Sequence, residues 1–141
     1  MDAADLKHIP LFSQLADAEA ANLAQMLETR RLAPNEVLFW LGEPGHEFFV
    51  IQRGRIHITF PDHSGREMTL AVLNAGDFLG EIALLDRGPR TATVTADTDM
   101  TVLVIDQRNF AGVIDQVPAL AHKLLATLAG RIRDLDRANY G

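Results

Sequence analysis

Two charged side chains in one short segment, GEIALLDRGPRTATV (residues 80–94), could perform specific chemistry. Glu81 follows a glycine, and Arg90 follows a Gly-Pro pair. Arginine is a fork-shaped hydrogen-bond donor that suits phosphate, whereas a carboxylate accepts hydrogen bonds from hydroxyl groups. Either the two side chains form a salt bridge that holds the turn, or both bind a ligand.

Backbone donors are expected beside these side chains. Residues 81–85 are long enough for about one helical turn, and the start of a helix presents unpaired N–H groups and a positive dipole end. Ala83 is small enough for a ligand to approach the backbone, Thr91 adds a hydroxyl group, and Ala92 adds a further N–H. The segment therefore predicts a pocket for one phosphate and one sugar hydroxyl, which are parts of a nucleotide.

Short β-strands are expected to position this segment. From residue 37 the hydrophobic pattern changes to the period of a strand, and the apolar runs are separated by turn residues. Arg53-Gly54 predicts a tight hairpin, and PDHSG predicts a second turn. No helix-length segment separates most of the strands, so the pattern favours a mainly β antiparallel β-roll or jelly roll over a parallel α/β fold. The expected strands are VLFW, FFVIQ, RIHITF, MTLAVL, TATVTA and MTVLVID.

Helices are expected before and after the strands. Apolar residues recur at helical spacing from Asp17, a candidate cap, up to Pro34-Asn35. Helical spacing returns after Asp106, and Pro118 begins the last of two C-terminal helices. That helix carries a heptad seam, which predicts either packing on its own domain or a homodimer contact. The seam residues are Ala121, Leu125, Leu128, Ile132 and Leu135.

Length and composition are typical of one globular domain. The 141 residues (1–141) are expected to fold together, with an N-terminal helical part over 1–33, a β-roll over 34–106 and C-terminal helices over 107–141. The net charge of -6 argues against direct nucleic-acid binding. Without cysteine, the chain can form no disulfide, iron–sulfur cluster or thiolate metal site. No signal peptide or membrane span is expected, so the predicted location is cytoplasmic.

The segment FLGEIALLDRGPRTATV (residues 78–94) resembles the phosphate-binding cassette of cyclic nucleotide-binding domains. The family pattern is glycine, glutamate, an aliphatic residue, alanine and leucine, then turn residues, proline-arginine, a small or hydroxyl residue and alanine. Each element is present. The order of front helices, β-roll with cassette and closing helices also matches the family, which includes catabolite-activator-type regulators, cyclic-nucleotide-dependent kinases and cyclic-nucleotide-gated channels.

The resemblance implies a cyclic AMP or cyclic GMP sensor without a metal, and it implies roles for particular residues. Glu81 would accept a hydrogen bond from the ribose 2′-hydroxyl, and Arg90 would pair with the cyclic phosphate. The N–H groups of Ile82, Ala83 and Ala92 would help Arg90. Thr91 would bind the phosphate or a guanine amino group, and Leu79 and Gly80 would shape the sugar pocket. The last helix would cap the base through Arg131, Arg133 or Tyr140.

Three functional classes remain open. The chain would be a stand-alone sensor that signals to an unknown effector through its C-terminal helices, or the sensor part of a longer transcription regulator. A metal-dependent cupin-type enzyme is the third class, but the single histidine in RIHITF does not match the paired histidines of that fold. The sequence offers no grouping of catalytic residues, so no enzyme activity is expected.

Overall fold

The computed structural model describes the backbone of residues 2–81 and 88–140, and the side chains of these ranges up to residue 134. The chain divides into two compact units. One unit is Met26–Phe110, and the other combines Met1–Gln25 with Ala111–Gly141. The first unit contains the strands and most of the predicted site, and the second contains most of the helical residues.

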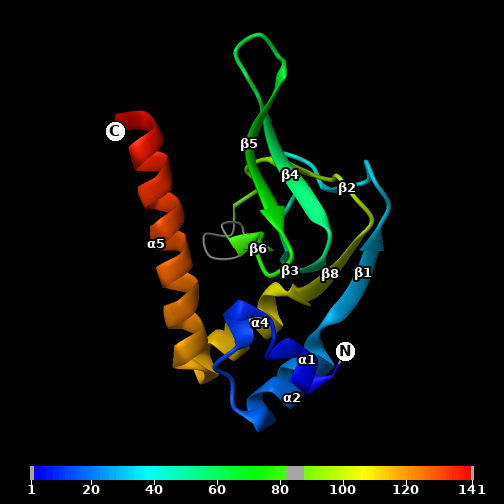
Figure 1. Ribbon diagram of the computed structural model, residues 1–141, viewed down its shortest axis with the longest axis vertical. Coiled ribbons are helices and arrows are strands. Elements are labelled where there is room, and N and C mark those ends of the chain that lie inside the picture. The colour runs from blue at the N-terminus through cyan, green and yellow to red at the C-terminus, as the bar shows by residue number, and fades with distance from the viewer. Residues whose placement is uncertain (1, 82–87, 141) are drawn as a thin grey trace. The chain divides into compact units, whose positions relative to one another are not determined.

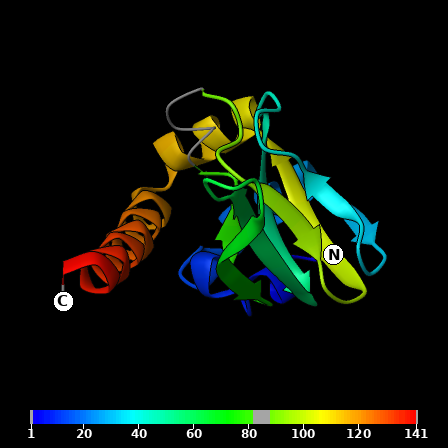
Figure 2. The same ribbon diagram turned by 90° about the horizontal axis from the view of Figure 1, so that it is seen from above.

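The β unit consists of two four-stranded antiparallel sheets, which confirms the expected β-roll (Figure 1). Figure 2 shows the same strands from above. The first sheet has the order β1-β8-β3-β6, and the second has the order β2-β7-β4-β5. The strands are β1 (Glu28–Leu32), β2 (Val37–Phe39), β3 (Glu47–Arg53), β4 (Arg55–Pro61), β5 (Glu67–Asn74), β6 (Phe78–Leu79), β7 (Thr93–Ala96) and β8 (Met100–Asp106).

An apolar core lies between the two sheets. Because side chains alternate along a strand, Phe49 and Ile51 of β3 enter this core and Phe48 points to the opposite face. On that opposite face Phe48 stacks on Phe110, with ring centroids 4.2 Å apart. The first sheet therefore buries apolar side chains on both faces at β3. The core cluster comprises Leu32, Phe39, Phe49, Ile51, Ile56, Leu79, Val94, Ala96, Met100, Val102 and Val104.

Two local predictions about the strands are wrong. Residues 28–32 form β1 and not the end of a helix, because this segment pairs with β8 from Glu28↔Val104 to Leu32↔Met100. The strands on either side of Gly54 are present, but β3 and β4 belong to different sheets and do not form a hairpin with each other. Gly54 has φ +101, and a Cβ there would lie 2.6 Å from the Asp99 carbonyl oxygen. The glycine therefore carries the chain from one sheet to the other.

The turn predicted at PDHSG is confirmed, and it joins β4 to β5. The Asp62 carboxylate accepts hydrogen bonds from the backbone N–H groups of Ser64 and Arg66, at 2.9 Å each. These bonds lower the pKa of the Asp62 carboxyl group, the hydroxyl of Ser64 having the largest effect.

The helices are α1 (Ala3–Leu6), a 3-10 turn η1 (Pro10–Phe12), α2 (Asp17–Met26), α4 (Gln107–Gln116) and α5 (Pro118–Tyr140). Asp106 caps α4 as predicted, since its carboxylate accepts from the Asn109 N–H at 2.8 Å. Asp17 does not cap α2 but is its first residue. The Glu19 carboxylate instead accepts from the Ala16 N–H at 2.8 Å. The capping bond thus comes from the first turn of the helix.

The helix α5 presents two faces that differ in burial. Leu120 and Leu124 are buried, whereas Leu125 and Ile132 of the predicted seam are exposed by 64% and 60%. Within its own unit, Lys123 of α5 donates to the Pro10 carbonyl oxygen in η1. Packing of α5 thus uses residues beside the seam and leaves part of the seam on the surface. The seam side chain of Leu135 lies outside the described residues.

Candidate cyclic nucleotide site

The backbone of Arg90 is held by the loop between β2 and β3. The N–H of Arg90 donates to the Glu43 carbonyl oxygen at 2.8 Å, and its own carbonyl oxygen accepts from the Gly42 N–H at 2.9 Å. Pro89, the residue before it, forms an isolated β-bridge with Pro44. These contacts fix where the Arg90 side chain leaves the backbone, three residues before β7.

The Arg90 side chain is buried, with 5% of the residue exposed. Its Nη2 donates to the Glu47 carbonyl oxygen at 2.8 Å, and its Nη1 donates to the Gly80 carbonyl oxygen at 3.4 Å. The guanidinium carbon also lies 4.3 Å from the ring centroid of Phe39 and 5.4 Å from that of Phe49. Both distances are within the range of a cation–π interaction.

The charge of this guanidinium is only partly compensated. Burial lowers the pKa of Arg90 below its ordinary value, and the carboxylates of Glu47, Glu43 and Glu81 oppose this effect in that order. Arginine remains protonated in proteins. Within residues 2–81 and 88–134, the ion pairs shorter than 4.0 Å join Lys7 to Asp17, Arg30 to Glu47, and Asp97 to both Arg55 and His57. None of these includes Arg90, whose two side-chain hydrogen bonds within the same residues go to neutral carbonyl groups.

Gly80, the residue directly after β6, lies close to Arg90. Its φ is +90°, a conformation that favours glycine. A Cβ at this position would lie 2.9 Å from Arg90 Nη1 and 2.9 Å from the Glu47 carbonyl oxygen. The absence of a side chain therefore leaves the space that the guanidinium occupies.

The other predicted site residues divide between described and undescribed positions. Leu79 is buried in β6 and pairs with Phe49 of β3. Glu81 is buried, with 5% of the residue exposed. Ala92 is buried and Thr91 is exposed. Ile82 and Ala83 lie outside the described residues. The structure therefore brings Gly80 and Arg90 into direct contact. Leu79, Glu81 and Ala92, which lie next to or near these two residues in the sequence, are buried.

A cassette of this composition on a β-roll of this topology has a counterpart among known proteins. The profile of the cyclic nucleotide-binding domain matches residues 29–117. The chain belongs to the cyclic nucleotide-binding domain family. The match includes all eight strands except the first residue of β1, together with α4.

Relatives of this cyclic nucleotide-binding domain include a cyclic AMP receptor protein and kinase regulatory subunits. The Cyclic AMP receptor protein of Thermus thermophilus is 35% identical over 132 residues, which are 93% of this chain and 61% of that protein. A cAMP-dependent protein kinase regulatory subunit of Hypocrea atroviridis is 32% identical over 118 residues, or 84% of this chain and 24% of that protein. The chain thus spans less than two thirds of the length of each of these relatives.

Two solved structures at more than 30% identity share the fold. The Thermus thermophilus Catabolite Activator Protein has a TM-score of 0.83 at 31% identity, and the match covers 92% of this chain and 61% of that chain. The N-terminal domain of a transcriptional regulator from Streptomyces coelicolor has a TM-score of 0.73 at 33% identity, with 97% and 96% of the two chains covered.

Four residues that contact the core of this cyclic nucleotide-binding domain's site were not predicted from the sequence: Arg30, Phe39, Glu47 and Phe49. They come from β1, β2 and β3, far from the cassette in the sequence. Three of them contact Arg90 through a backbone oxygen or an aromatic ring face, which no residue pattern marks. The only available signal was the position of Glu47 directly before two phenylalanines in a predicted strand.

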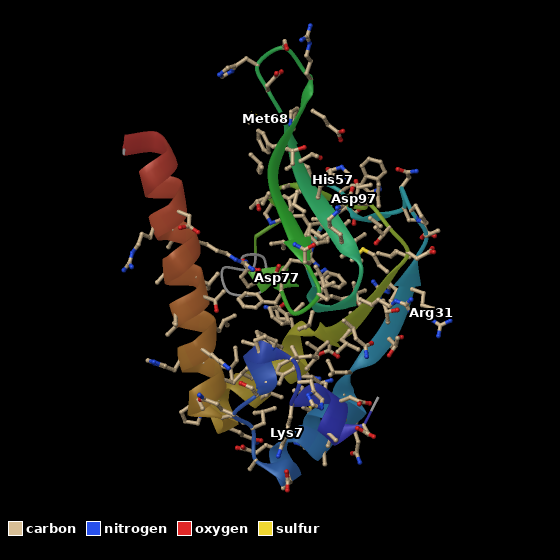
Figure 3. The ribbon with its side chains drawn as sticks, in the orientation of Figure 1. Lys7, Arg31, His57, Met68, Asp77 and Asp97 are labelled. Atoms are coloured by element: carbon tan, nitrogen blue, oxygen red, sulfur yellow. The ribbon has the colours of Figure 1, made fainter. Side chains whose placement is uncertain are left out.

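The histidines give no metal site in the part of the chain that the structure describes, where no group of three potential ligands occurs. His57 instead contacts the Asp97 carboxylate through Nδ1, and Figure 3 labels both residues beside each other. Likewise, no described helix is both long and apolar enough to span a bilayer.

Proposed function

We propose that this domain binds a cyclic mononucleotide and acts as a regulatory sensor, with Arg90 pairing with the cyclic phosphate. The observation that carries the proposal is the buried guanidinium, whose hydrogen bonds go to two carbonyl oxygens. These bonds use two of its five N–H donors. Within residues 2–81 and 88–134, the charge and further donors therefore remain for an anionic ligand.

The sugar and base contacts of the proposal follow the family cassette. Glu81 accepts from the ribose 2′-hydroxyl, and the N–H groups of Ile82, Ala83 and Ala92 join Arg90 at the phosphate. Leu79 and Gly80 line the sugar. Thr91 binds the phosphate or a syn guanine. Cyclic AMP is the preferred ligand, which the names of the Thermus and Hypocrea relatives support, and cyclic GMP is the alternative.

The proposed output is a population shift of the C-terminal helices in a cytoplasmic protein. Binding at the cassette favours a state in which α4 moves and α5 closes over the base through Arg131, Arg133 or Tyr140. The exposed seam residues Leu125 and Ile132 then contact a second copy or an effector protein. We assign the domain no catalytic function.

Isothermal titration of cyclic AMP into the wild type and Arg90→Ala tests the proposal. Removing one member of a desolvated charge pair costs about 2–5 kcal/mol, so affinity should fall by about two to three orders of magnitude. Arg31→Ala is the matched control, because Arg31 is exposed. This variant should bind cyclic AMP with the affinity of the wild type. Equal affinities of Arg90→Ala and wild type would refute the phosphate role of Arg90.

A second candidate is the sensor part of a longer transcription regulator. The Streptomyces structure supports it, because that chain is the N-terminal domain of a transcriptional regulator and the two chains match over nearly their full lengths. A gel-shift assay with the product of the intact reading frame, with and without cyclic AMP, tests this candidate. Ligand-dependent DNA binding is expected, and its absence would favour the stand-alone sensor.

A further inference from the structure

A second arginine, Arg30, approaches the same groups as Arg90. Arg30 Nη2 lies 3.0 Å from Glu47 Oε2, and Nη1 lies 3.3 Å from Oε1, so the pair is bidentate. In the register Arg30 is opposite Val102 of β8, which is a core residue, so Arg30 projects from the core-facing side of its sheet. The ion pair therefore crosses β8 on the face that carries the site.

Glu47 is connected to both arginines. Its carboxylate binds Arg30, and its backbone carbonyl oxygen accepts from Arg90 Nη2 at 2.8 Å. The ring of Phe49 has the same two neighbours, since its centroid is 5.9 Å from the guanidinium carbon of Arg30 and 5.4 Å from that of Arg90. Glu47, which carries this carboxylate, thus already contacts Arg90, the proposed phosphate-binding residue, through its backbone.

We propose that Arg30 is a positioning residue that keeps the Glu47 carboxylate away from Arg90, so that the Arg90 guanidinium stays available for an anionic ligand. The inference rests on the proposed function of Arg90. The Glu47 carboxylate is the anion that would compete with the phosphate for Arg90. In the structure this carboxylate pairs with Arg30.

Without Arg30, two anions would compete for one guanidinium. The Glu47 side chain is only 34% exposed, so without Arg30 its charge would lose a partner in a partly desolvated position. Arg90 is then an alternative cation, bound to the same residue through its backbone. A carboxylate and a phosphate both suit the guanidinium fork. A ligand would have to displace Glu47 before it could bind, and its apparent affinity would fall.

Three variants and one control test this inference by titration of cyclic AMP. Arg30→Gln should weaken binding about tenfold, the effect of about 1.4 kcal/mol of competition. Arg30→Gln combined with Glu47→Gln should restore the affinity to within about twofold of wild type, because the competitor has lost its charge. Glu47→Gln alone should bind like the wild type. Arg31→Gln is the control, because it removes the same charge from the neighbouring position of β1 (Figure 3 labels Arg31). Arg31 pairs with Thr101, which lies off the core face.

The rescue separates competition from simple bracing of the sheet. If the ion pair only held β1 and β3 together, Glu47→Gln and the double variant would bind as weakly as Arg30→Gln, and this result would overturn the inference. Wild-type affinity in Arg30→Gln would overturn it as well. Arg90→Ala, measured in parallel, reports on the proposed function itself. If Arg90→Ala binds weakly while Arg30→Gln binds normally, only the role of Arg30 fails.

Side-chain NMR of Arg90 gives a readout that does not depend on a ligand. In the absence of cyclic AMP, the Nε resonance of Arg90 should shift in Arg30→Gln and return toward its wild-type position in the double variant. An unchanged Arg90 resonance in Arg30→Gln would contradict the proposed transfer of the Glu47 carboxylate.

Discussion

Replacement of Gly80 by alanine tests whether the site depends on the close approach of β6 to Arg90. Two penalties add at this position. The first is backbone strain, because a non-glycine residue at φ +90° costs about 1–2 kcal/mol. The second is steric. The new methyl group would lie 2.9 Å from Arg90 Nη1, 2.9 Å from the Glu47 carbonyl oxygen and 3.3 Å from Phe49 Cδ2.

The size of the effect follows from these contacts. Overpacking in a closely packed region costs about 1–3 kcal/mol, so Gly80→Ala should destabilise the protein by about 2–5 kcal/mol in total. The guanidinium is the neighbour that can move, since the other two contacts belong to the backbone and the core. Its displacement should weaken cyclic AMP binding by about tenfold or more, the loss of one charge-assisted hydrogen bond.

Gly65→Ala is the matched control for this prediction. Gly65 has φ +85°, but a Cβ there meets no atom within 4 Å. Gly65→Ala should lose only about 1–2 kcal/mol of stability, from backbone strain, and should keep the wild-type affinity for cyclic AMP. Urea unfolding measures the stability of both variants, and titration measures the affinity. If Gly80→Ala were no less stable than Gly65→Ala and bound cyclic AMP normally, the packing of Arg90 against Gly80 would be refuted.

Two further predictions concern stability. Burial raises the pKa of Asp97, but hydrogen bonds from His57 and Arg55 outweigh it and leave the pKa below its ordinary value. The stabilisation by a carboxylate with a depressed folded-state pKa is present near neutral pH and is lost as the pH falls. The stability gap between wild type and Asp97→Asn should therefore shrink from about pH 5 to about pH 3, and a constant gap in urea unfolding would contradict this. On α5, Leu124→Ala should cost about 2–5 kcal/mol because Leu124 is 3% exposed, whereas Leu125→Ala at 64% exposure should change thermal stability by less than about 0.5 kcal/mol. Similar losses for both variants would mean that Leu125 is covered, for instance in a dimer.

The strands were predictable wherever their residues favour β structure by themselves. RIHITF and MTVLVID contain β-branched and aromatic residues at the period of a strand, and both form strands. Residues 28–32, ETRRL, contain residue types that favour helices, and the helical pattern continues into them from α2. Pairing with β8 overrides this preference, because the ladder hydrogen bonds and the burial of Leu32 depend on a partner about 70 positions away.

The hairpin at Gly54 failed for a related reason. A glycine between two apolar runs marks a reversal of the chain, but it does not specify which strands pair across it. The surroundings of Gly54, close to Asp99 and Met100, leave room only for a residue without a side chain. The tertiary structure decides that β3 pairs with β8 and β4 with β7, because each pair lies in one of the two sheets that enclose the core.

By itself, the sequence of this protein determined the chemistry of its candidate site. Glycine, glutamate, proline-arginine and alanine at fixed spacing form one local segment, whose donors and acceptors depend on residue type alone. Only the tertiary structure decided the surroundings of the arginine. The oxygen of Glu47 and the rings of Phe39 and Phe49 come from strands more than 40 positions away. A backbone carbonyl is common to every residue, and a ring face becomes a binding surface only when the fold places a cation over it. For this reason the sequence could name Arg90 but not the contacts that hold it.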